Sequence, residues 1–151
     1  MLCDIRSVEN VGAIFRTADA CGVSEIILGG YTPAPLDRFG RPRKDLAKAA
    51  LGAETFIPWR AEKNSLTVIK KMKGEGFLAV AVEQSPKAVD YKTVEIKGKN
   101  SLIILGNEVD GISPAIIEEA DIVVQITMLG HKKSLNVSVA TGIVLYRLLN
   151  I

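Results

Sequence analysis

A segment rich in carboxylate and amide groups follows an apolar run in the second half of the sequence. After SLIILG come Asn107, Glu108 and Asp110, and this polar group lies between Gly106 and Gly111. The glycines allow the backbone to turn and to approach a ligand closely. The Lys-Ser/Thr pair of a phosphate-binding loop is missing, and two carboxylates would repel phosphate. The segment indicates either a site for another kind of ligand or an acidic turn that only ends a strand.

A second polar segment, TMLGHKKSLN at 127–136, follows another apolar run and precedes a stretch of small residues. Gly130 gives the backbone freedom, and Ser134 and Asn136 supply short hydrogen-bonding groups. This pattern suggests the rim of a cofactor site, although the commoner role of Ser134 or Asn136 would be to cap a helix. His131 is the only histidine, which excludes a site built from several, and we expect no metal site.

Near the start of the sequence, Asn10 and Arg16 lie six residues apart, nearly two turns along a helix. Arg16 adjoins Phe15 on the margin of an apolar face. Its stem could simply cover apolar side chains. Alternatively, its guanidinium could point to an anion at the ends of the strands.

Segment 37–48 is the one local basic patch, and Tyr31 and Phe39 lie near it or within it. Its cations are Arg38, Arg41, Arg43, Lys44 and Lys48. A solvated loop is the first expectation, but interleaved aromatics and prolines also favour contact with RNA or a nucleotide. The net charge of the chain is only +2, so a basic footprint must be local.

The elements that must position these groups alternate between apolar, strand-like runs and amphipathic, helix-like runs. We expect strands within 1–5, 24–30, 55–59, 77–83, 101–106 and 121–126. We expect helices over 11–22, 45–52, 65–76, from 114 onward, and over 137–150, with Asn10, Asn64, Ser113 and Asn136 at N-terminal caps. This order predicts an open, mostly parallel α/β sheet with helices on both faces. In such sheets ligands bind beyond the carboxyl ends of the strands.

Length and composition are those of one globular domain. The chain has 151 residues, of which 48% are hydrophobic and 24% charged. No apolar run is long enough to span a bilayer, and the first residues are too charged for a signal peptide. Cys3 and Cys21 lack metal-binding spacing. We therefore expect free thiols and a cytoplasmic protein with no membrane association.

Three segments resemble the motifs of the SpoU/TrmH family of RNA ribose methyltransferases, within the SPOUT superfamily. ENVGAIFRTADACGV resembles the first motif, LGNEVDGIS the second and ITMLGHKKSLNVSVATGIVLYRL the third. Their order and spacing agree with the family, and the resemblance covers nearly the whole chain. It implies an α/β sheet whose C-terminal part is threaded into a trefoil knot, and a homodimer with the active site at its interface.

The resemblance also implies the cofactor S-adenosylmethionine, held largely by backbone groups of the second and third motifs. The positions implied are Leu105, Gly106, Asn107, Ile126, Met128, Gly130, Ser134, Leu135 and Asn136.

The catalytic residues implied by the resemblance are Arg16, Asn10, Glu108, Ser134 and Asn136. Family proposals make the arginine a base, but its pKa of about 12 or more suits that role poorly. We favour Arg16 as a group that binds a phosphate or stabilises a developing alkoxide. Glu108 and Asn136 would then orient the hydroxyl and the methyl donor.

These implications predict a methyltransferase that modifies the ribose 2′-hydroxyl of a tRNA or rRNA nucleotide. We expect one domain over 1–151 without a separate RNA-binding domain, which slightly favours tRNA and leaves RNA contact to the basic patch. One alternative is a catalytically silent RNA-binding or assembly protein of the same fold. Another is a nucleotide-binding α/β domain, which the missing glycine fingerprint disfavours.

Overall fold

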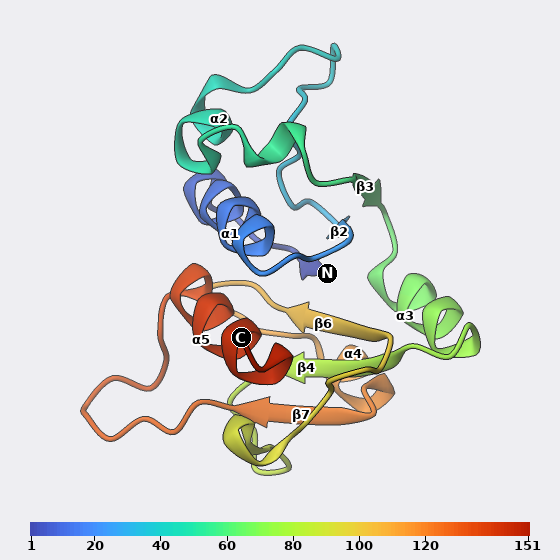
Figure 1. The fold of residues 1–151 in the computed structure, drawn as a ribbon, viewed down its shortest axis with the longest axis vertical. Coiled ribbons are helices and arrows are strands. Elements are labelled where there is room, and N and C mark those ends of the chain that lie inside the picture. The colour runs from blue at the N-terminus through green and yellow to red at the C-terminus, as the bar shows by residue number, and fades with distance from the viewer.

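One seven-stranded sheet, in which every pairing is parallel, forms the centre of the molecule (Figure 1). The computed structural model describes all residues from 1 to 151. The strands are β1 (Leu2–Cys3), β2 (Ile26–Gly29), β3 (Trp59–Glu62), β4 (Leu78–Val82), β5 (Val89–Asp90), β6 (Ser101–Leu105) and β7 (Ile122–Gln125). Their order is β3-β2-β1-β6-β4-β7-β5. The expected parallel α/β sheet is confirmed.

Helices cover both faces of this sheet. They are α1 (Val8–Ala20), α2 (Lys44–Ala50), α3 (Ser65–Gly74), α4 (Pro114–Glu119) and α5 (Val137–Leu149), with 3-10 turns at Ala53–Thr55 and Tyr91–Thr93. None of them is long and apolar enough to cross a membrane.

The alternation of side chains along the strands explains the two layers. Leu2 and Leu28 pack in the cluster formed with α1 and α2, whereas their neighbours Cys3 and Ile27 pack with α3 and α4. Val80 of β4 packs against α5. The inner strands β1, β2, β4 and β6 therefore bury both of their faces, which is why these segments are almost continuously apolar, whereas the edge strands β3 and β5 are less buried.

The first helix starts earlier than its hydrophobic pattern indicates. It begins at Val8, and the hydroxyl of Ser7 accepts a hydrogen bond from the Asn10 amide at 3.1 Å. The expectation that Asn10 caps this helix is therefore wrong, because Ser7 already does so. The side chain of Asn10 is consequently free to bond elsewhere.

Other boundaries follow expectation with local exceptions. Asn64 and Asn136 cap α3 and α5 through their side chains, as expected. Ser113 precedes Pro114 but makes no side-chain capping bond. The third strand lies at Trp59–Glu62 instead of 55–59, because the 3-10 turn takes up the preceding residues. The short strand β5 lies outside all of the expected strands.

Helices α1 and α2 approach each other closely at Gly12. A Cβ atom there would lie 2.7 Å from the Cβ of Ala49 and 2.7 Å from the carbonyl oxygen of Leu46. We expect Gly12→Ala to lower the free energy of unfolding by about 1–2 kcal/mol, because overpacking outweighs the better helix propensity of alanine. Urea unfolding followed by circular dichroism measures this change.

Gly142→Ala in α5 is the matched control for this prediction. A Cβ atom at Gly142 would meet only the Cγ2 of Thr17, at an ordinary 3.7 Å. We expect this variant to gain about 0.5–1 kcal/mol from helix propensity. If Gly12→Ala and Gly142→Ala changed the free energy of unfolding in the same direction, the packing argument would be contradicted.

Candidate active site

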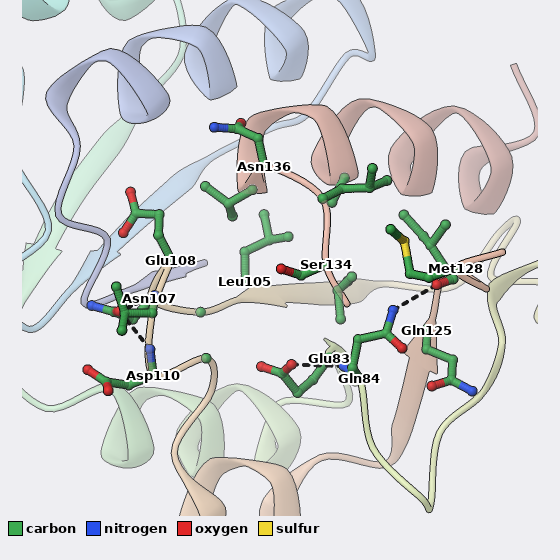
Figure 2. Close-up of a pocket in the computed structure, with 18 residues that line it drawn as sticks. Glu83, Gln84, Leu105, Asn107, Glu108, Asp110, Gln125, Met128, Ser134 and Asn136 are labelled. Carbon is green, nitrogen blue, oxygen red and sulfur yellow. Dashed lines mark hydrogen bonds between the residues drawn. The ribbon is translucent and has the colours of Figure 1, made fainter. Parts of the chain in front are cut away.

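A cavity of about 420 Å³ lies beyond the carboxyl ends of β4, β6 and β7 (Figure 2). This volume lies within the range of roughly 300–1,000 Å³ that is typical of small-molecule sites. The walls come from the residues that follow these three strands and from the start of α5. Eight of the positions predicted to bind a cofactor line it: Leu105, Gly106, Asn107, Ile126, Met128, Ser134, Leu135 and Asn136. Gly130 does not line it.

The loop after β6 folds back tightly on Gly106. A Cβ atom at Gly106 would lie 2.5 Å from the carbonyl carbon of Gly111 and 2.6 Å from the amide nitrogen of Ile112. Backbone hydrogen bonds of 3.1 and 3.0 Å join Asn107 to Gly111, whose φ of 68° is in the left-handed region. The two glycines are therefore what this turn requires.

The side chain of Asn107 holds this loop in shape. Its Nδ2 donates to the carbonyl oxygen of Asp4 at 2.8 Å and to the hydroxyl of Tyr31 at 2.7 Å. Its Oδ1 accepts from the amides of Val109 and Asp110 at 2.7 and 3.0 Å. The hydrogen-bonding groups of the buried Asn107 side chain are thus all bonded within the protein. The backbone of the loop is left to face a ligand.

A chain of side-chain hydrogen bonds joins three segments that are distant in sequence. Glu108 Oε1 accepts from Asn10 Nδ2 at 2.8 Å, and Asn10 Oδ1 accepts from Asn136 Nδ2 at 3.0 Å. Asn136 also caps α5, because its Oδ1 accepts from the amide of Ser138 at 2.9 Å. The connection runs from the loop after β6, through α1, to the start of α5.

The carboxylate of Glu108 also anchors the segment before α1. It accepts from the amides of Arg6 at 2.9 Å and Ser7 at 3.0 Å. Burial disfavours the charged form, but these two amides and the side chain of Asn10 outweigh it and hold the pKa of Glu108 below its usual value. Glu108 is therefore a carboxylate at neutral pH.

This lowered pKa predicts acid sensitivity. The stabilisation from ionised Glu108 is complete above the ordinary carboxyl pKa of about 4.3 and is lost as pH falls through the lower folded-state value. We expect Glu108→Gln to be less stable than the natural chain at about pH 7, with the difference shrinking at about pH 3. Urea unfolding of both proteins across this range tests it. A gap that stays constant or widens in acid would contradict the role assigned to the carboxylate.

The structure gathers four of the five predicted catalytic residues at one edge of the sheet. Glu108, Ser134 and Asn136 line the cavity, and Asn10 is bonded to two of them. Arg16 is exposed on α1 outside the cavity, and its side chain makes no hydrogen bond or ion pair. Its catalytic role stays a prediction.

Glu83 and Gln84 form a part of the site that the sequence analysis missed. Glu83 Oε2 accepts from the Ile112 amide at 2.8 Å, and Gln84 Nε2 donates to the Ile126 carbonyl at 2.7 Å. Figure 2 shows Glu83 between the group of Asn107, Glu108 and Asp110 and the side chains after β7. The residues directly follow β4, so the rule applied to the other strand ends would have found them.

The basic patch lies apart from the cavity and is partly neutralised. Arg41 pairs with Asp37 at 2.8 Å, and Arg43 pairs with Asp45 at 2.7 Å. The cations without an acidic partner are Arg38, Lys44 and Lys48.

Comparison with known proteins places this geometry in a family. The sequence model of the SpoU rRNA Methylase family matches residues 1–146. A tRNA (guanosine(18)-2′-O)-methyltransferase of Aquifex aeolicus is 34% identical over 143 residues, which cover 95% of this chain and 64% of that protein. This chain spans about 55–64% of the length of the curated relatives it matches.

Solved structures agree over nearly the whole chain. An rRNA methyltransferase from Sinorhizobium meliloti, crystallised with S-adenosylmethionine, superposes with a TM-score of 0.87 at 34% identity, covering 99% of this chain and 54% of that one. A TrmH/SpoU tRNA modifying enzyme of A. aeolicus gives a TM-score of 0.85 at 30% identity, covering 99% and 72%. The chain in which these three segments meet thus belongs to the SpoU rRNA methylase family.

Proposed function

We propose that this chain is a methyltransferase domain that transfers a methyl group from S-adenosylmethionine to a ribose 2′-hydroxyl of tRNA or rRNA, with tRNA favoured. The observation that carries the proposal is the hydrogen-bonded connection Glu108–Asn10–Asn136, which joins the three motif segments at one cavity. The 2′-O-methyltransferase activity named for the Aquifex relative supports the reaction. Its tRNA substrate supports the preference.

The chemistry of the cavity fits a cationic cofactor. Glu83, Glu108 and Asp110 line it, whereas no lysine, arginine or histidine does. A sulfonium ion is therefore favoured over an anionic ligand. Apolar side chains offer a surface for an adenine ring, and they include Leu105, Ile126, Met128 and Leu135. When bound, S-adenosylmethionine would supply an electrophilic methyl group.

The protein's own part in this reaction would be alignment and charge stabilisation. Glu108 already accepts three N–H groups, so we propose that it positions Asn10 and the start of α1. Ser134 and Asn136, which line the cavity, would orient the reacting hydroxyl. Arg16 would bind the neighbouring phosphate or stabilise the developing alkoxide.

Because Arg16 lies outside the cavity of its own chain, we propose that a homodimer completes the site. Leu129, Val139 and Tyr146 leave apolar surface exposed near and along α5, with Leu129 96% exposed. A second copy would cover this surface. Analytical ultracentrifugation tests the dimer, and a purely monomeric protein would contradict it.

We also propose that the C-terminal part is knotted, as the family resemblance implies.

Methyl transfer tests the proposal directly. Purified protein is incubated with radiolabelled S-adenosylmethionine and, separately, with total tRNA and with ribosomal RNA. We expect label in the tRNA pool. After alkaline hydrolysis, the phosphodiester bond next to the labelled ribose should remain intact, because a 2′-O-methyl group blocks its cleavage. Binding of S-adenosylmethionine without transfer to either pool would instead indicate a catalytically silent RNA-binding protein. Absence of S-adenosylmethionine binding would contradict the cofactor assignment.

A further inference from the structure

An aromatic ring is exposed to solvent at one end of the molecule, in a loop that does not line the cavity. The loop between β2 and α2 projects beyond α2, on the opposite side of α1 from α5 (Figure 1). Phe39 lies near its tip and is 66% exposed. The guanidinium carbons of Arg38 and Arg41 lie 4.7 and 5.0 Å from the centre of its ring. The ring adds nothing to any of the buried clusters.

The turn that carries Phe39 is held in place by its own hydrogen bonds. Asp37 Oδ1 accepts from the amides of Phe39 at 2.8 Å and Arg41 at 3.0 Å, and its Oδ2 pairs with the Arg41 guanidinium at 2.8 Å. A bridge between Leu36 and Pro42 closes the loop. The backbone that carries the exposed ring is thus held in place before any partner arrives, which lowers the entropy cost of binding.

We propose that Phe39, together with Arg38 and Arg41, is a stacking site for an unpaired base of the RNA substrate. This inference rests on the proposed activity on RNA and names the substrate more narrowly. A base can stack on the exposed part of the ring or on the planar guanidinium of Arg38 that lies over it, and Arg38 can instead contact an adjoining phosphate. Arg38 has no acidic partner and so keeps its full charge for this purpose.

The chemistry of the site selects single-stranded or loop RNA. In a duplex the base faces are covered by their neighbours, so a protruding phenyl ring cannot reach them. No residue of this loop lines the cavity. The base held at Phe39 is therefore an anchor nucleotide, distinct from any nucleotide in the cavity of the same chain.

The test compares RNA binding by matched variants. A dye-labelled RNA of about 12 nucleotides, within the length such sites cover, is titrated with the full chain by fluorescence anisotropy. The same strand annealed to its complement provides the duplex arm. We expect Phe39→Ala to weaken binding of the single strand about tenfold and to leave duplex binding unchanged. Phe39→Trp should retain or improve it.

Phe56→Ala is the control, because Phe56 is 78% exposed and no cation lies over its ring. It should bind both RNAs like the natural chain. Equal affinity of Phe39→Ala and the natural chain for the single strand would overturn the stacking site, and transfer of label to RNA would show that the methyltransferase proposal survives. Equal loss on strand and duplex would also overturn it. If the natural chain bound neither RNA and labelled none, both proposals would fail together.

Discussion

Replacing Arg16 with alanine should lower kcat/KM for RNA methylation by about 100- to 1,000-fold, the usual effect of removing one group that stabilises transition-state charge. The affinity for S-adenosylmethionine should not change, because Arg16 does not line the cavity. Stability should stay within about 0.5 kcal/mol, because the side chain is exposed and unpaired. Transfer of radiolabel measures kcat/KM, isothermal titration calorimetry measures the affinity for S-adenosylmethionine, and urea unfolding measures stability.

Arg16→Lys refines this prediction. Lysine keeps the charge but loses the two parallel N–H groups that bind a phosphate, so we expect activity between that of the natural chain and that of Arg16→Ala. Near-full activity of Arg16→Lys would argue against bidentate recognition of a phosphate by Arg16. Lys63→Ala, which removes another exposed cation without an acidic partner, should leave activity unchanged.

The second large effect is expected at Gly106. In Gly106→Ala the new methyl group would collide with backbone atoms of Gly111 and Ile112, which lie only 2.5 and 2.6 Å from the position of its Cβ. Backbone cannot move aside as a flexible side chain can, so the loop from Asn107 to Gly111 must shift. We expect S-adenosylmethionine binding to fall by 100-fold or more and the free energy of unfolding to fall by about 1–3 kcal/mol.

Gly74→Ala provides the comparison for Gly106→Ala. A Cβ atom at Gly74 would have no neighbour within 4 Å. Both variants are first tested by circular dichroism, and titration calorimetry then measures cofactor affinity. A folded Gly106→Ala protein that bound S-adenosylmethionine normally would show that the loop does not form the cofactor site.

Local features of the fold could be predicted from the sequence because local physics decides them. The apolar runs identify most of the strands, since a strand buried on both faces needs apolar side chains throughout. The caps Asn64 and Asn136 bond to amides two or three residues away. By contrast, Ser7 and Asn10 are both residue types that favour an N-terminal cap, so the local sequence does not decide between them. In the structure Ser7 caps α1, and the side chain of Asn10 bonds to the distant Glu108.

The sequence could predict which segments form the site, but not which side chains in them contact one another. The family resemblance implied nine cofactor residues, eight of which line the cavity. It could not show that the side chain of Glu108 bonds to Asn10 of α1, because these two residues are 98 positions apart. Glu83 belongs to no motif, and only its place directly after β4 could have identified it. Segment 37–48 sets two aspartates against five cations, and only the structure shows that these aspartates pair with Arg41 and Arg43.

The bond between Asn10 and Asn136 spans 126 residues, almost the full length of the chain. Contacts of such separation close the largest loops, and a folding chain makes them late because the entropy cost is high. The cavity thus completes only when the last helix docks on the first. Detachment of α5 alone would dismantle it while most of the sheet stayed folded, so enzyme activity should disappear at a lower denaturant concentration than strand structure.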